Sequence, residues 1–186
     1  VGDMEELFDV AKALVMQPPA RGDRIAILTD GGGVGVMAAD ETEAIGLKLA
    51  NLSKESQLAF QKLKEERIIP PIAATVNPID LTGSATDYSF VEAMKILLED
   101  DNVDGIIVLV LHHVPGVTAE LPSKLASLSK KYDKPVVAMD VGSSQYAREF
   151  RELFEREGIP AYPEPERAVR AMKALVTFGR VKSPPE

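Results

Sequence analysis

Short runs of consecutive apolar residues alternate with amphipathic segments along most of this chain. The apolar runs are bounded by glycine, proline or polar residues, which is typical of buried strands. Between them, apolar residues recur every three or four positions, which is typical of helices that cover a sheet. The pattern predicts strands at 25–28, 47–50, 105–111, 135–139 and 159–162, and helices at 4–16, 34–45, 88–99, 121–132, 144–157 and 165–178, with a further helix opening at 53–56.

Strands that are apolar along their whole length and alternate with helices are typical of parallel sheets covered on both faces. We therefore expect an α/β fold, a doubly wound and mostly parallel sheet with helices on both faces. In such sheets ligands bind outside the carboxyl ends of the strands. The segments at that edge are 30–33, 77–83, 112–116 and 140–144, and the second of them ends a long irregular stretch with room for one short strand. Loops of that length inside compact domains tend to be functional.

The loop after the first strand carries three consecutive glycines, Gly31, Gly32 and Gly33, directly before a predicted helix. Glycine allows a close approach that a Cβ would forbid. The first turn of a helix presents unpaired N–H groups and the positive end of the helix dipole. This order of elements predicts a site for phosphate or carboxylate, although other loops of this kind are only tight connections.

The first predicted helix lies apart from the alternating pattern. It places Met4, Leu7, Phe8, Ala11, Leu14 and Val15 at helical spacing, and Pro18 and Pro19 end it. Two interpretations stay open: a connector from an upstream domain, or an N-terminal helix packed on its own sheet. We expect residues 1–22 to be a connector helix and linker, 23–182 to be the domain, and 183–186 to be a tail.

Composition narrows the function. The chain has 186 residues, a net charge of -8 and no cysteine. Its acidic surface argues against nucleic-acid binding, and the lack of cysteine excludes disulfides and thiolate metal sites. Without a long apolar run or a basic N-terminal region before an apolar stretch, a cytoplasmic location is expected. An aromatic content of 5% without tryptophan also argues against flavin stacking.

Two rival sites can be weighed from the residues. The segment 33–38 satisfies G-x-G-x-x-A, but the second strand does not end in the carboxylate that a dinucleotide site requires. His112 and His113 are neighbours at a predicted strand end, where successive side chains point to opposite faces. The pair is therefore poorly placed to ligate one metal, and we expect one packed and one hydrogen-bonded imidazole, with His113 the candidate for contact with an anion.

Three stretches together resemble one domain of the NDP-forming acyl-CoA synthetases, the ADP-forming acetate–CoA ligase group related to succinyl-CoA synthetase. They are IAILTDGGGVGVMAAD at 25–40, VNPIDLTG at 76–83 and GIPAYPEPERAV at 158–169. The resemblance runs over nearly the whole chain. It implies the C-terminal, flavodoxin-like domain of the synthetase α subunit, with the first helix as its inter-domain helix.

The resemblance also implies a reaction and partners. The whole enzyme converts acyl-CoA, ADP and phosphate to carboxylic acid, CoA and ATP, and it uses CoA, ATP or ADP, and Mg²⁺. The phosphohistidine and CoA-binding domains are expected upstream in the same subunit, and the nucleotide in an ATP-grasp part. This chain lacks those parts, so we expect it to be inactive alone, to hold no catalytic side chain and no metal, and to belong to an oligomer. The alternative is an assembly or regulatory domain of a related synthetase or of a fused protein acetyltransferase.

In this family, the domain closes one side of the phosphate and acyl site with loop amides and a helix N-terminus. The substrate- and phosphate-binding residues are accordingly expected to be Asp30, Gly31, Gly32, Gly33, Asn77, Asp80, Thr82, Gly83 and His113. The family usually has Asn where this chain has Asp30. A carboxylate there would repel an anion unless it caps amides or is protonated.

Overall fold

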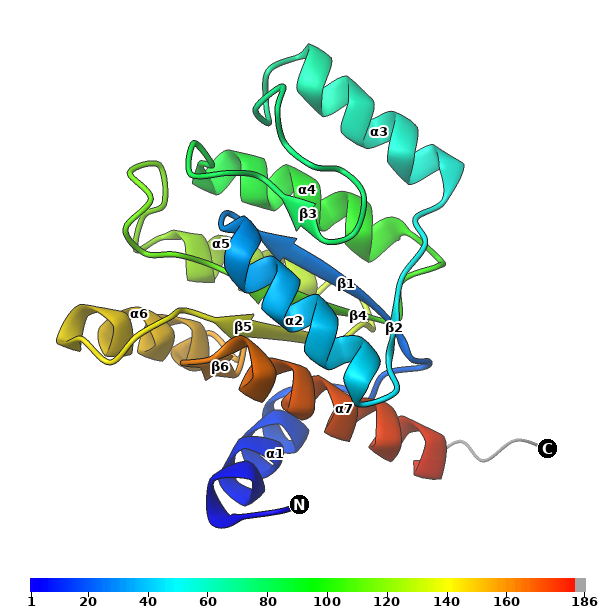
Figure 1. Cartoon of the computed structure of the whole chain (residues 1–186), viewed down its shortest axis with the longest axis vertical. Coiled ribbons are helices and arrows are strands. Elements are labelled where there is room, and N and C mark those ends of the chain that lie inside the picture. The colour runs from blue at the N-terminus through cyan, green and yellow to red at the C-terminus, as the bar shows by residue number, and fades with distance from the viewer. Residues whose placement is uncertain (183–186) are drawn as a thin grey trace.

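The computed structural model describes residues 1–182, so the predicted tail at 183–186 lies outside the described residues. Its strands are β1 (Arg24–Thr29), β2 (Lys48–Leu49), β3 (Ile79–Asp80), β4 (Gly105–Leu109), β5 (Val136–Met139) and β6 (Ala161–Tyr162). Its helices are α1 (Met4–Met16), α2 (Gly32–Ala44), α3 (Lys54–Glu65), α4 (Asp87–Glu99), α5 (Leu121–Ser129), α6 (Gln145–Arg156) and α7 (Pro165–Lys182). Every pairing between these strands is parallel, and helices flank both faces of the sheet (Figure 1). The predicted α/β fold is confirmed.

The strand order is β2-β1-β4-β5-β6, and β3 pairs with β1 outside this path. Leaving β3 aside, the order is that of flavodoxin-like proteins, in which the chain first adds a strand on one side of β1 and then continues on the other. The direction reverses between β1 and β4. Their carboxyl ends therefore border the crevice where such folds bind ligands.

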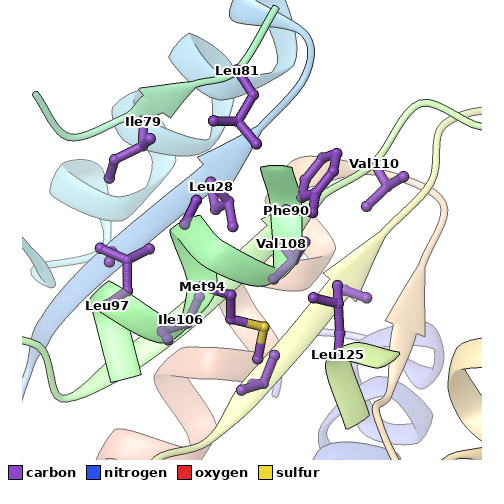
Figure 2. Close-up of a cluster of buried hydrophobic side chains, with 14 of the residues drawn as sticks. Leu28, Ile79, Leu81, Phe90, Met94, Leu97, Ile106, Val108, Val110 and Leu125 are labelled. Carbon is purple, nitrogen blue, oxygen red and sulfur yellow. The ribbon is translucent and has the colours of Figure 1, made fainter. Parts of the chain in front are cut away.

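The two faces of the sheet carry separate apolar layers, because successive strand residues point to opposite sides. On one face Leu28, Ile106 and Val108 pack against Phe90 and Met94 of α4 (Figure 2). On the other face, alternating residues of the same strands pack against α7 and α2; the group includes Ile25, Ile27, Ile107, Leu109, Ala38, Met172 and Leu175. The sheet is thus buried on both sides, which fixes the edge at which loops are free to bind.

The first helix lies against α7 (Figure 1). Its bounds agree with the predicted helix at 4–16, but the side that it packs with is not the apolar one. Asp9 and Ala13 are its buried residues, whereas Phe8 and Val15 are exposed. The helix thus packs on the domain itself, and the division of the chain into domains stays a prediction.

Several predicted boundaries are wrong. Helix α5 ends at Ser129 and not at residue 132, β6 begins at Ala161 and not at residue 159, and α7 continues to Lys182 beyond residue 178. Two further differences lie at the carboxyl edge of the sheet. Helix α2 begins at Gly32 and not at residue 34, because Gly31 is its N-cap and the next two glycines form its first turn. Strand β4 ends at Leu109 and not at residue 111, because the Leu111 N–H turns to a carboxylate of a neighbouring loop and leaves the strand ladder.

Candidate anion-binding site

A carboxyl group bridges the carboxyl ends of β1 and β4. Asp30 follows β1, and its Oδ1 and Oδ2 lie 3.0 and 3.3 Å from the backbone nitrogen of Leu111, which donates to them. Asp30 is only 3% exposed. At the switch point, where the strand order reverses between β1 and β4, the buried Asp30 carboxyl thus accepts a hydrogen bond from the Leu111 amide.

The surroundings of Asp30 disfavour its charged form. Burial raises the pKa of this carboxyl to about 7, helped by the charges of Asp140 and Asp80 and opposed by the hydrogen bond from Leu111. A carboxyl with this pKa is neutral for a large fraction of the time at physiological pH. An aspartate here would repel an anion unless it caps amides or is protonated. The surroundings of Asp30 favour protonation.

The N-terminus of α2 lacks a side-chain cap. Gly31 is the N-cap and has no side chain with which to accept the first amides of the helix. In contrast, α1, α3, α4 and α6 are capped by Asp3, Ser53, Thr86 and Ser144. The N–H groups of Gly32, Gly33 and Val34 are left for solvent or for an anion, at the positive end of the helix dipole.

The three glycines differ in what a side chain would meet. A Cβ at Gly31 would lie 2.6 Å from Leu111 Cδ1, and one at Gly32 would lie 2.8 Å from Asp80 Oδ2. Packing within the domain therefore explains why these two positions carry glycine. At Gly33 an added Cβ would have no neighbour within 4 Å. The space in front of Gly33 is open to a ligand.

The second predicted loop lies beside the first. Asp80 ends β3 and reaches Gly32, and its Oδ1 accepts from the Thr82 N–H at 2.8 Å. Thr82 has a left-handed φ of 67°, and its hydroxyl accepts from the Ser84 N–H. Gly83 is exposed, with open space where a Cβ would stand. Asp80 and Thr82 thus shape this loop, and contact with a ligand stays a prediction for both and for Gly83.

Asn77 completes the sheet. Its Oδ1 accepts from the Ile27 N–H at 2.9 Å, and its Nδ2 donates to the carbonyls of Ile25 and Ala50 at 2.8 and 3.1 Å. The amide therefore fills the edge of β1 between the end of β2 and the start of β3. It also lines a cavity of about 690 Å³ beside β2, away from the switch point. The observed contacts of Asn77 are structural ones.

The two histidines do not point to opposite faces, so that prediction is wrong. Because β4 ends early, both lie in a turn, and their ring centroids are 3.8 Å apart. His112 is buried, and its Nδ1 lies 2.6 Å from Oδ2 of the fully buried Asp140. Burial raises the pKa of Asp140, and the contact with His112 opposes that shift. His113 is the exposed ring, and contact with an anion stays a prediction for it.

The second ring nitrogen of His112, Nε2, differs from the first. Within residues 1–182, His112 Nε2 is a buried polar atom without a hydrogen-bond partner. The rings of His113 and Tyr146 lie against His112 at a tilt, with ring centroids 3.8 and 5.0 Å from that of His112. Asp140 was within reach of sequence reasoning, since it directly follows β5 at the same edge. Its pairing with His112 was not, because no local pattern signals it.

The described residues do not gather a metal site. Residues 1–182 hold no group of three or more histidines, cysteines or carboxylates that could bind an ion, and none of their helices is long and apolar enough to cross a membrane. Asp30, the three glycines and Asp80 come together at one spot, while Asn77 lies along the strand edge. The arrangement offers backbone donors and no nucleophile–base pair in contact with them.

Comparison with known proteins identifies the family of this chain. The family model described as "Ligase-CoA domain" matches residues 25–183. The chain belongs to the Ligase-CoA domain family. It is similar to two subunits from Pyrococcus furiosus, the α subunits of ADP-forming acetate–CoA ligase I and II, with 37% and 35% identity over 96% and 93% of this chain.

Solved structures agree with the sequence relatives. The fold matches the crystal structure of PH0766 from Pyrococcus horikoshii with a TM-score of 0.86 and 34% identity, over 98% of this chain and 41% of that one. It also matches a Ca. Korarchaeum cryptofilum dinucleotide-forming acetyl-coenzyme A synthetase solved with phosphate and ADP, with a TM-score of 0.82 and 31% identity, over 98% of this chain and 38% of that one. This Ligase-CoA domain spans 37% of the length of each Pyrococcus furiosus subunit.

Proposed function

We propose that this Ligase-CoA domain forms one wall of the phosphate and acyl site of an ADP-forming acyl-CoA synthetase. The enzyme would convert acyl-CoA, ADP and phosphate to carboxylic acid, CoA and ATP. The relatives from Pyrococcus furiosus are ADP-forming acetate–CoA ligase subunits, and a structural neighbour was solved with phosphate and ADP. These names support the reaction class, and the chain spans 37% of the length of each of these subunits.

The observation that carries the proposal is the uncapped start of α2 with open space in front of Gly33. Phosphate and an acyl phosphate are both anions, and fixed N–H donors at a helix N-terminus stabilise them without reorganising. The domain therefore contributes binding and orientation, while the covalent steps fall to groups on other parts of the enzyme.

Cofactors and partners follow from this division of labour. CoA, ATP or ADP, and Mg²⁺ would be held by the upstream phosphohistidine and CoA-binding domains and by the ATP-grasp part. The cytoplasm remains the proposed compartment.

The third glycine of the loop, Gly33, offers a sharp test, because the fold has room for a side chain there. Gly33→Ala should fold at least as stably as the original, since alanine is favoured over glycine in helices by roughly 1 kcal/mol. The added methyl group would stand in the space proposed for the anion. Val36→Ala, at an exposed position on the same helix, is the matched control.

The readout is phosphate titration of ¹⁵N-labelled protein. We expect saturable shifts of the Gly32, Gly33 and Val34 amides, weakened at least tenfold by Gly33→Ala and unchanged by Val36→Ala. Equal phosphate affinity in the original chain and Gly33→Ala would contradict the proposed position of the anion. Absence of any saturable shift in the original chain would favour the assembly role.

A further inference from the structure

The outer face of α1 is apolar and exposed. Met4, Phe8 and Val15 are 64%, 67% and 86% exposed, and Leu7, Ala11 and Leu14 are exposed beside them. Their spacing of three and four residues places all six on one side of the helix. An amphipathic helix ordinarily buries such a stripe against its own domain. Here the stripe points away from it.

This orientation is fixed by polar contacts on the inner side of α1. Arg167 of α7 donates from Nε and Nη2 to the two carboxylate oxygens of Asp9 at 2.7 and 2.9 Å. Asp9 is 6% exposed, and the Tyr162 hydroxyl donates to its carbonyl at 2.9 Å. A two-pronged pair in so buried a place orients the helix strongly.

Further along α1 the anchoring continues. Lys12 donates to Glu155 and to the carbonyl of Ala161, both at 2.7 Å. Gln17, just beyond the helix, donates to the carbonyl of Gly158 at 2.6 Å and accepts from the Val136 N–H at 2.8 Å. Rotating the apolar stripe inward would break all of these contacts and would leave Asp9 and Lys12 without their partners. These contacts therefore hold the apolar stripe at the surface of the domain.

The size of the stripe decides between two occupants. The exposed parts of these side chains amount to roughly 500 Å² of apolar surface, near the upper end of what a monomer leaves uncovered. A symmetrical pair of such stripes would bury about 1,000 Å², which is at the low end for a stable dimer. A partner on the same polypeptide needs less area, because the tether supplies a high effective concentration. This Ligase-CoA domain spans only 37% of the α subunits to which it is similar, so a tethered partner is available in that family.

We propose that the outer face of α1, made of Met4, Leu7, Phe8, Ala11, Leu14 and Val15, docks against an apolar surface on the remainder of a synthetase α subunit. The inference rests on the proposed function, because that function supplies the rest of the subunit. The occupant is an uncharged surface, since the stripe itself has no charged side chain. The contact would set the orientation of the α2 N-terminus relative to the other domains.

The absence of cysteine from the sequence makes this contact measurable by thiol labelling. Phe8→Cys places a unique thiol in the stripe, and Leu58→Cys places one at a 70% exposed position on α3 as the matched control. Each variant is labelled with a maleimide in two settings. One is the chain alone, and the other is a chimera in which the chain replaces the matching part of the Pyrococcus furiosus acetate–CoA ligase I α subunit. Peptide mass spectrometry follows labelling at positions 8 and 58.

In the chain alone, we expect the thiol of Phe8→Cys to react at nearly the rate of the thiol of Leu58→Cys. In the chimera, the thiol at position 8 should react at least tenfold more slowly, while the rate at position 58 stays unchanged. Equal rates at position 8 in both settings would overturn the proposal. Slow labelling at position 8 in the chain alone, with a dimer in sedimentation, would also overturn it and would make a second copy the occupant.

A second experiment avoids the exchange of domains. A cysteine at the aligned helix position of the intact Pyrococcus furiosus α subunit should be protected in the same way, and free reactivity there would count against the proposal. Activity separates this inference from the proposed function. An active Phe8→Cys chimera with a freely reactive thiol refutes the docking alone, whereas a protected thiol in an inactive chimera supports the docking and counts against the proposed function.

Discussion

Replacing Asp30 by asparagine tests the electrostatics of the switch-point crevice. The Asp30→Asn side chain keeps an oxygen for the Leu111 N–H and removes the group whose pKa burial raises to about 7. An unfolded aspartate titrates near a pKa of about 3.9, so the folded chain binds the proton more tightly than the unfolded chain does. Stability therefore falls as the pH rises from about 4 to about 7, and the loss is complete above the folded pKa.

The magnitude follows from the shift. About three pH units correspond to about 4 kcal/mol at roughly 1.36 kcal/mol per unit, and partial relaxation of the site makes about 2 to 4 kcal/mol a realistic range. Asp30→Asn should therefore be more stable than the original chain by that amount at pH 8, and the advantage should shrink toward zero near pH 4.

The assay is urea unfolding followed by circular dichroism at pH 4, 5, 6, 7 and 8. Asp40→Asn, which changes an exposed carboxyl on α2, should alter stability by less than about 0.5 kcal/mol throughout. A difference between Asp30→Asn and the original chain that is constant with pH would refute the buried-carboxyl reasoning. So would a lower stability of Asp30→Asn at pH 8.

Two further substitutions test the packing that positions the site. Asn77→Ala removes the hydrogen bonds of the side chain to the Ile27 N–H and to the carbonyls of Ile25 and Ala50, of which the Ile25 carbonyl keeps the Ala50 N–H as a donor. The change should lower the free energy of unfolding by about 2 to 4 kcal/mol. Asn51→Ala, at an exposed position, should change it by less than about 0.5 kcal/mol, and equal effects of the two substitutions would show that the strand edge does not depend on the Asn77 amide. Arg167→Ala leaves the buried Asp9 carboxylate without its guanidinium partner. It should lower the free energy of unfolding by about 2 to 3 kcal/mol and speed hydrogen exchange in α1. Arg156→Ala, which removes an exposed ion pair with Glu152, should lower the free energy of unfolding by less than about 0.5 kcal/mol. Unchanged exchange in α1 after Arg167→Ala would contradict the anchoring role.

The sheet and the edge where its strand ends gather were predictable because their causes are local. Continuous apolar strands between amphipathic helices leave few arrangements other than a covered parallel sheet. Once the strands are parallel, Asp30, Asp80 and Asp140 must meet at one edge, since each lies at the end of a strand. The same rule could not show that Asp30 reaches across to the Leu111 amide, because that contact joins segments far apart in the sequence.

Other features escaped prediction for the same reason. Periodicity identifies the apolar side of the helix at 4–16, but it does not tell what covers that side, and the polar partners on α7 and β6 reverse the usual orientation. An asparagine in a loop resembles a ligand residue, and only the fold shows Asn77 completing the hydrogen bonds of β1. The ring contact between His112 and His113 follows from the early end of β4, which in turn follows from Asp30.

The proposal that this domain is one wall of a synthetase active site is tested most directly by ATP formation from acetyl-CoA, ADP and phosphate. The chain alone would be compared with the chain supplied with the phosphohistidine, CoA-binding and ATP-grasp parts, and those parts would be shown competent beside their own matching domain. ATP that appears only in the completed mixture is the predicted result. No ATP in that mixture, with the added parts competent, would contradict the proposal and leave assembly as the role of this domain.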